Sequence, residues 1–142
     1  MITAISGLDN FQQLHLPHVP IKSSNLGSGQ MQGGGYTPQQ LQSAYGVDQL
    51  LKNNINGHGQ VIAIFATHDD ANAESDLNTY SMQFHLTPCT SANGCFAKFN
   101  QYGASSPLPL PLPTGETPDE TSIDTQMVHS LAPGATIHLY EA

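Results

Sequence analysis

The stretch Gln60-Val-Ile-Ala-Ile-Phe-Ala-Thr67 decides the fold class of this 142-residue chain. It is a nearly continuous run of apolar residues, several of them β-branched, and Gly59 precedes it. Runs of this kind are typical of strands in parallel sheets, where helices cover both faces. We therefore predict a strand that is buried on both faces.

The residues that follow this strand predict a turn and then a helix. His68-Asp69-Asp70 is polar enough for a turn, and residues 74–84 then place Leu77, Tyr80 and Phe84 on one helical face. A strand, a turn and a helix in this order begin an α/β unit. The fold class is accordingly predicted to be α/β, with a parallel sheet flanked by helices.

The second half of the chain carries signals for one more helix and two more strands. The alternating proline tract at 107–113 is expected to be extended and on the surface. Thr117-Pro118-Asp119-Glu120 has the pattern of a helix cap, with Ile123, Met127 and Leu131 on one face of the helix that follows. The expected elements are a strand at 96–99, a helix at 117–132 and a strand at 136–140.

Residues 1–35 differ from the rest of the chain in having no sustained periodicity and a Gly- and Ser-rich end. We place a boundary near Tyr36, which leaves 1–35 as a tail and linker and 36–142 as one domain. Thr37-Pro38-Gln39-Gln40 predicts a capped helix that ends at Gly46, and residues 47–51 predict a second, short helix.

The charge balance excludes several classes of partner. Eleven acidic residues stand against three lysines, which gives a net charge of −8. Such a surface repels phosphate backbones and anionic lipid, so neither nucleic acid nor a membrane is an expected partner. No stretch is long and apolar enough for a membrane helix, and no secretion signal is evident. A surface rich in carboxylates also suits acidic conditions, where its repulsion is relieved.

The two cysteines enclose a short, turn-rich loop. Cys89 and Cys95 flank Thr-Ser-Ala-Asn-Gly, and a disulfide closes a loop of this size easily. A disulfide persists only in an oxidising compartment, such as the periplasm or the outside of the cell. Two unrelated free thiols are the alternative.

Glu120 and Asp124 are the candidate catalytic residues. Because they are four residues apart on a predicted helix, they lie one turn apart on the same side. Two carboxyl groups held close together cannot both ionise easily, which separates their pKa values and fits one of them for general acid and base chemistry. A capping box between Thr117 and Glu120 explains the same acid without catalysis.

The chain resembles the sedolisin (serine-carboxyl peptidase) family, of the subtilisin-like clan. In that family a Glu and an Asp four apart on a helix are followed by an Ala-Pro-Gly-Ala segment and a strand, as Glu120, Asp124 and residues 132–135 are here. Residues 2–10 are similar to the end of the family's propeptide, so 1–35 is expected to be a propeptide tail. Further collinear matches are Tyr36–Gly46, Gly57–Ile64, Asp76-Leu77, Phe84–Pro88 and the cysteine loop before Phe96.

This resemblance implies an incomplete subtilisin-like fold and a secreted or periplasmic, acid-acting serine endopeptidase of polypeptides. Glu120 would be the base for a serine, and Asp124 would support Glu120. The family's serine, a further aspartate and a calcium site lie downstream and have no counterpart here. The chain is therefore expected to need the missing C-terminal half of the peptidase domain, to be inactive alone, and to hold no cofactor itself. Thr117 and Gln126 depart from the family pattern, so the resemblance does not define the substrate pocket.

Three other interpretations compete with this one. Asp69 or Asp70 could be the aspartate of a true subtilisin, although His129 stands at the end of a helix rather than at its start. His68, Asp69 and Asp70 could bind a metal, although neighbouring residues of a turn seldom converge on one ion. The chain could also be a truncated, non-catalytic module whose polyproline tract binds an aromatic groove.

Overall fold

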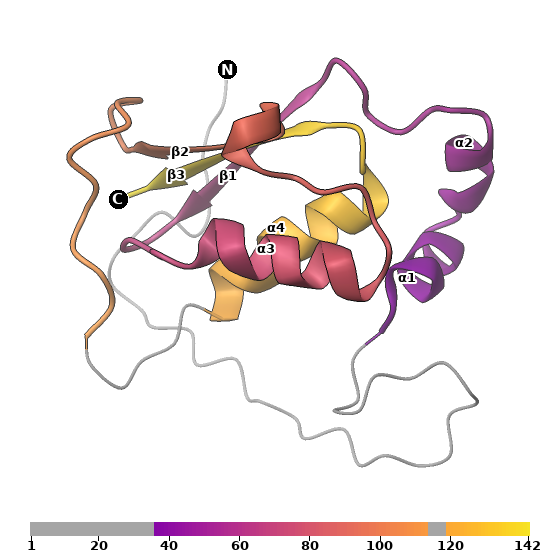
Figure 1. Ribbon diagram of the computed structural model, residues 1–142, viewed down its shortest axis with the longest axis horizontal. Helices are drawn as coiled ribbons and strands as arrows, with labels where there is room; N and C mark the ends of the chain where they lie inside the picture. Colours follow the sequence, from indigo (N-terminus) through magenta and orange to yellow (C-terminus); the bar gives the residue numbers. More distant parts are fainter. Residues whose placement is uncertain (1–35, 114–118) are drawn as a thin grey trace, which may run out of the picture.

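The computed structural model describes residues 36–113 and 119–142 (Figure 1). The predicted tail and linker at 1–35 and the predicted cap at Thr117-Pro118 lie outside the described residues. The predicted helices and strands of the described ranges are present, with ends shifted by a residue or two. They are α1 Pro38–Ala44, α2 Asp48–Lys52, β1 Val61–Ala66, α3 Ala73–Gln83, a 3-10 turn at Ser91–Asn93, β2 Phe96–Asn100, α4 Asp119–Leu131 and β3 Thr136–Glu141.

Helix α1 begins as its sequence predicts. The Thr37 hydroxyl accepts a hydrogen bond from the Gln40 amide at 3.3 Å, and the Gln40 side chain accepts one from the Thr37 amide at 2.9 Å. Pro38 occupies the first helical position, where no amide hydrogen is needed. Helix α1 packs against α4, where the Gln42 side-chain NH₂ group donates to the Ser130 carbonyl at 2.8 Å.

The three strands form one parallel sheet in the order β1-β3-β2. The chain passes from β1 through α3 to β2, and then returns through α4 to β3. Both helices lie on the same face of the sheet (Figure 1). Since the two crossovers run in opposite directions across the sheet, one of them must be left-handed, which is rare between parallel strands.

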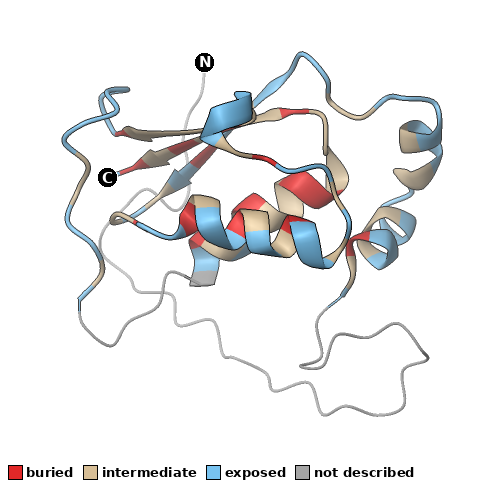
Figure 2. Cartoon of the chain, in the orientation of Figure 1, coloured by how far each residue is buried: buried red, intermediate tan, exposed pale blue. Residues whose placement is uncertain are grey.

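The core lies between the sheet and these two helices (Figure 2). Leu77 of α3 is fully buried there, and Val128 of α4 packs against the same cluster. The buried members of the core are Ile64, Ala73, Leu77, Cys89, Phe96, Ile137 and Leu139. All four strand residues in this list point to the helix side, as alternation along a strand requires.

The prediction that β1 is buried on both faces is wrong for the described residues. Val61 is 58% exposed and Phe65 is 73% exposed, whereas Ile64 is buried. The reason is that α3 and α4 both cover the other face. A row of stacked rings lies on the uncovered face, which we call the aromatic face: Phe65 to Tyr140 at 5.4 Å, Tyr140 to Phe99 at 5.2 Å, and His138 edge-on to Phe99 at 5.1 Å between ring centres.

We predict that the two faces of the sheet differ sharply in their sensitivity to truncation. Leu77→Ala should lower the free energy of unfolding by about 2–5 kcal/mol, because it opens a cavity in the core. Phe65→Ala should cost at most about 1 kcal/mol, mainly for the lost ring stacking. Urea unfolding of the two variants measures both values. Equal losses would show that the aromatic face is covered in solution.

No helix within residues 36–113 and 119–142 is both long and apolar enough to cross a membrane.

Candidate functional site

The first turn of α4 lies at the carboxyl edge of the sheet. Residues 132–135 reverse the chain between α4 and β3, so the two elements run antiparallel (Figure 1). The 13 residues of α4 and the six of β3 both span about 20 Å. Glu120 is therefore level with the end of β3. In open α/β sheets, ligands bind outside the carboxyl ends of the strands.

The turn that sets this geometry is tightly packed. The Gly134 amide donates to the Asn56 carbonyl at 2.8 Å, and a Cβ atom at Gly134 would lie 2.5 Å from the Asn56 side-chain oxygen. Only glycine fits at this position without a shift of Asn56. This is a physical reason for the glycine in the segment Ala132-Pro133-Gly134-Ala135.

Glu120 and Asp124 lie one turn apart on α4, as their spacing predicts. Glu120 is exposed and Asp124 is half-buried. Burial raises the pKa of Asp124, and the nearby Glu120 carboxylate raises it further. Asp124 therefore keeps its proton to a higher pH than a free aspartate does, and as an acid it can donate a hydrogen bond. The competing capping box involves Thr117, which lies outside the described residues.

The buried face of α4 is not its apolar stripe. Ile123 is 58% exposed, whereas Thr121, Thr125, His129 and Ser130 are buried. Two of these polar side chains are satisfied on the preceding turn: the Thr125 hydroxyl donates to the Thr121 carbonyl at 2.9 Å, and that of Ser130 to the Gln126 carbonyl at 2.7 Å. The stripe of Ile123, Met127 and Leu131 consequently borders the acid pair instead of the core.

A second polar group, which the sequence motifs did not predict, lies at the same edge; we call it the Lys98 cluster (Asp69, Asp70, Lys98 and Glu141). The Lys98 ammonium donates to the Asp69 carboxylate and, at 2.7 Å, to the Asp70 carbonyl. It also lies 3.5 Å from Glu141 Oε2. The Asp70 amide donates to Glu141 Oε1 at 2.9 Å. The cluster joins the ends of all three strands.

Burial dominates the electrostatics of this cluster. It raises the pKa of Glu141 to about 7, despite the opposing effects of the Asp70 amide and the Lys98 charge. Burial also raises the pKa of Asp70. Glu141 Oε2 and Asp70 Oδ2 are buried without a hydrogen-bond partner among the described residues. Of the three residues His68, Asp69 and Asp70 of the alternative metal site, Asp69 is paired with the Lys98 cation.

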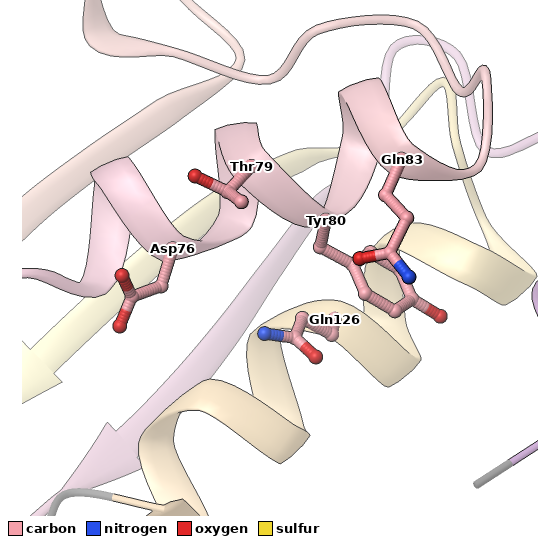
Figure 3. Close-up of a pocket in the computed structure, with 5 residues that line it drawn as sticks. All are labelled: Asp76, Thr79, Tyr80, Gln83 and Gln126. Atoms are coloured by element: carbon pink, nitrogen blue, oxygen red, sulfur yellow. The ribbon is translucent and has the colours of Figure 1, made fainter. Parts of the chain in front are cut away.

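A pocket of about 280 Å³ lies between α3 and α4 (Figure 3). Its lining is polar except for the Tyr80 ring, whose hydroxyl is 2.8 Å from the Ser130 hydroxyl. Gln126, the residue from α4, is about half a turn around the helix from Asp124. The pocket therefore lies on another side of α4 from the acid pair. Its lining residues are Asp76, Thr79, Tyr80, Gln83 and Gln126.

Cys89 and Cys95 form the predicted disulfide, with their Cα atoms 4.9 Å apart. Cys89 is fully buried in the core, and the loop between the cysteines contains a 3-10 turn capped by Thr90 and Asn93. His129 packs beside both sulfur atoms. The disulfide thus ties the start of β2 to the core beneath α4.

The Cys89→Ser, Cys95→Ser double variant should lose stability. The disulfide restricts the unfolded chain, and for a loop this short that restriction stabilises the folded state by about 2 kcal/mol. The variant also places a hydroxyl in the buried Cys89 position. We expect the free energy of unfolding to fall by at least about 2 kcal/mol in urea titrations under oxidising conditions. A double variant as stable as the unmutated 142-residue chain would contradict this expectation.

Comparison with known proteins finds no match for this chain among family models, curated proteins or solved structures.

Proposed function

We propose that this chain is part of an acid-acting, serine-type endopeptidase of the sedolisin type, with a subtilisin-like fold. The observation that carries the proposal is the acid pair: an exposed Glu120 above a half-buried Asp124 of raised pKa, at the carboxyl edge of a parallel sheet. The collinear motifs from residue 2 to residue 142 support the same assignment. The disulfide fits a protein that is exported.

In this proposal the two carboxyl groups have different roles. Asp124, whose pKa is raised by burial and by the Glu120 carboxylate, keeps its proton to a higher pH than a free aspartate does and donates a hydrogen bond toward Glu120, which stabilises the ionised form of Glu120. Exposed in the first turn of α4, Glu120 then takes the proton of a serine hydroxyl and returns it to the leaving amine. The serine and the groups that stabilise the oxyanion would come from the downstream part of the domain.

The alternative, a non-catalytic module that presents its polyproline tract, has less support. The Leu110 carbonyl accepts a hydrogen bond from the Asp69 amide at 3.1 Å, and Asn100 donates to the Pro107 carbonyl at 2.9 Å. Pro111 pairs with Asp69 in an isolated bridge. The tract is thus anchored to the carboxyl edge, which favours its role as an insertion within a larger domain.

The test uses the natural protein that contains this chain and its downstream sequence, which we call the parent protein. It measures whether the parent protein cleaves a denatured protein at acid pH. We expect activity that depends on Glu120, and none from the 142-residue chain alone. Activity of the isolated chain that Glu120→Gln abolishes would overturn the expected dependence on a downstream serine. A parent protein without acid-dependent cleavage would overturn the proposed function itself.

A further inference from the structure

We propose that the chain, once its disulfide is reduced, binds a zinc ion through Cys89, Cys95 and His129. This site is separate from the acid pair, and the inference does not depend on the proposed peptidase function. It rests on the geometry of three side chains, two from the loop at residues 89–95 and one from α4.

The three side chains already converge in the core. The two sulfur atoms and a ring nitrogen of His129 all lie within 4.8 Å of one another. Cys89 and His129 are fully buried, and the Cα atoms of the cysteines are 4.9 Å apart. Tetrahedral zinc, with Zn–S bonds of about 2.3 Å, holds two sulfur ligands about 3.8 Å apart. Rotation of the reduced side chains can provide that separation.

His129 has the hydrogen bonding of a histidine ligand. Its Nε2 lies 2.7 Å from the Thr87 carbonyl, which only accepts, so Nε2 carries the proton. Nδ1 is then left with a free lone pair, and it is buried without a hydrogen-bond partner in the described part of the chain. Histidine ligands of metals commonly donate their other ring N–H to a backbone carbonyl in this way.

The charge balance also fits zinc. A dithiol reductant transfers two electrons and two protons to the disulfide, which gives two cysteine thiols and the oxidised, disulfide form of the reductant. Zinc then displaces both thiol protons, and two thiolates with a neutral imidazole bring the net charge of the ion and its ligands to zero. A neutral centre avoids the high cost of a buried net charge. Water can take the fourth position.

Zinc would replace the disulfide as the link that closes the loop at residues 89–95. In reducing conditions the ion would join this loop to α4 through His129, and in oxidising conditions the disulfide closes it. The start of β2 would then stay in place in either condition.

The experiment titrates the full 142-residue chain with Co²⁺, with and without a thiol-free reductant, and then displaces the Co²⁺ with Zn²⁺. We expect the reduced chain to bind one Co²⁺ with thiolate-to-cobalt charge-transfer absorption, and the oxidised chain to bind none. His129→Gln should weaken binding by about tenfold or more, whereas His58→Gln, at an exposed histidine, should leave the affinity unchanged.

X-ray absorption of the unmutated zinc complex keeps the test independent of how the variants fold. Two sulfur atoms and one imidazole nitrogen around zinc would support the site. The proposal is overturned if the reduced chain takes up no metal, if the oxidised chain binds equally well, if His129→Gln binds as tightly as the parent chain, or if imidazole is missing from the zinc coordination.

Discussion

Under the proposed function, Glu120→Gln in a protein that contains this chain and its downstream sequence is expected to lower kcat/KM for a denatured protein substrate by about 10²–10⁴-fold at acid pH. Glutamine keeps the size of the side chain but cannot take a proton from a serine. The loss should appear in kcat rather than KM, because the proton transfer belongs to the transition state and not to substrate binding. Stopped assays of peptide release at several substrate concentrations separate the two constants.

Asp124 should behave as a positioning residue for Glu120. Asp124→Asn keeps a hydrogen-bond donor and should retain more activity than Asp124→Ala. It should also weaken the decline of activity as the pH rises through the raised pKa of Asp124, since asparagine does not lose a proton there. Asp48→Asn is the matched control. Asp48 lies on α2, far from Glu120 and Asp124 in the sequence, and its substitution should change neither kcat nor KM. If Glu120→Gln leaves kcat unchanged, Glu120 is not the base.

The sequence predicted the elements of the fold well because their signals are local. The capping box at Thr37 and the β-branched run after Gly59 involve neighbouring residues only, and both produced the expected element. The missed feature of the sheet was not local. Whether β1 is covered on both faces depends on which side two distant helices pack, and the left-handed crossover places both on one side.

The buried face of α4 does not follow from apolar periodicity, for a different reason. Apolar periodicity favours Ile123, Met127 and Leu131, but Thr125 and Ser130 satisfy their hydroxyl groups on the preceding turn, so burial costs them little. His129 is likewise satisfied at Nε2 by the Thr87 carbonyl. Patterns of hydrophobicity count such residues as polar and assign them to the surface.

The Lys98 cluster was not predicted, although the strand pattern around Lys98 contains a signal for it. Lys98 stands between Phe96 and Asn100 on the same side of β2, and a lysine on the inward side of a strand requires a buried acid. Nothing in the sequence says which acid it pairs with, because Asp69 and Glu141 are brought to it only by the order β1-β3-β2.

Lys98→Met should cost about 3 kcal/mol of unfolding free energy at pH 8, because it leaves Glu141 and Asp69 without their cation. Lys52→Met is the matched control. Lys52 is exposed and lies 3.5 Å from Asp48 one turn away, so its removal should cost about 0.5 kcal/mol or less. Urea unfolding of the full chain measures both variants.

The loss of unfolding free energy caused by Lys98→Met should be smaller at pH 5 than at pH 8, because Glu141 is protonated at pH 5. Its pKa is raised from 4.5 to about 7 in the folded chain, so the folded state binds the extra proton between these values. The contribution of Glu141 to stability therefore falls as the pH rises from about 4.5 to 7. Lys98 lowers this pKa, so Lys98→Met raises it further, and Glu141 is neutral at pH 5 with or without the lysine.

The double variant Lys98→Met, Glu141→Gln separates this explanation from a simple packing loss. Glutamine cannot ionise, so the double variant should be more stable than Lys98→Met at pH 8 and nearly equal to it at pH 5. Glu141→Gln alone should flatten the fall in stability between pH 5 and 8, because it removes the group that binds the extra proton. An equal cost of Lys98→Met at both pH values would mean that Glu141 is not ionised beside Lys98, and that the lysine acts on Asp69 alone.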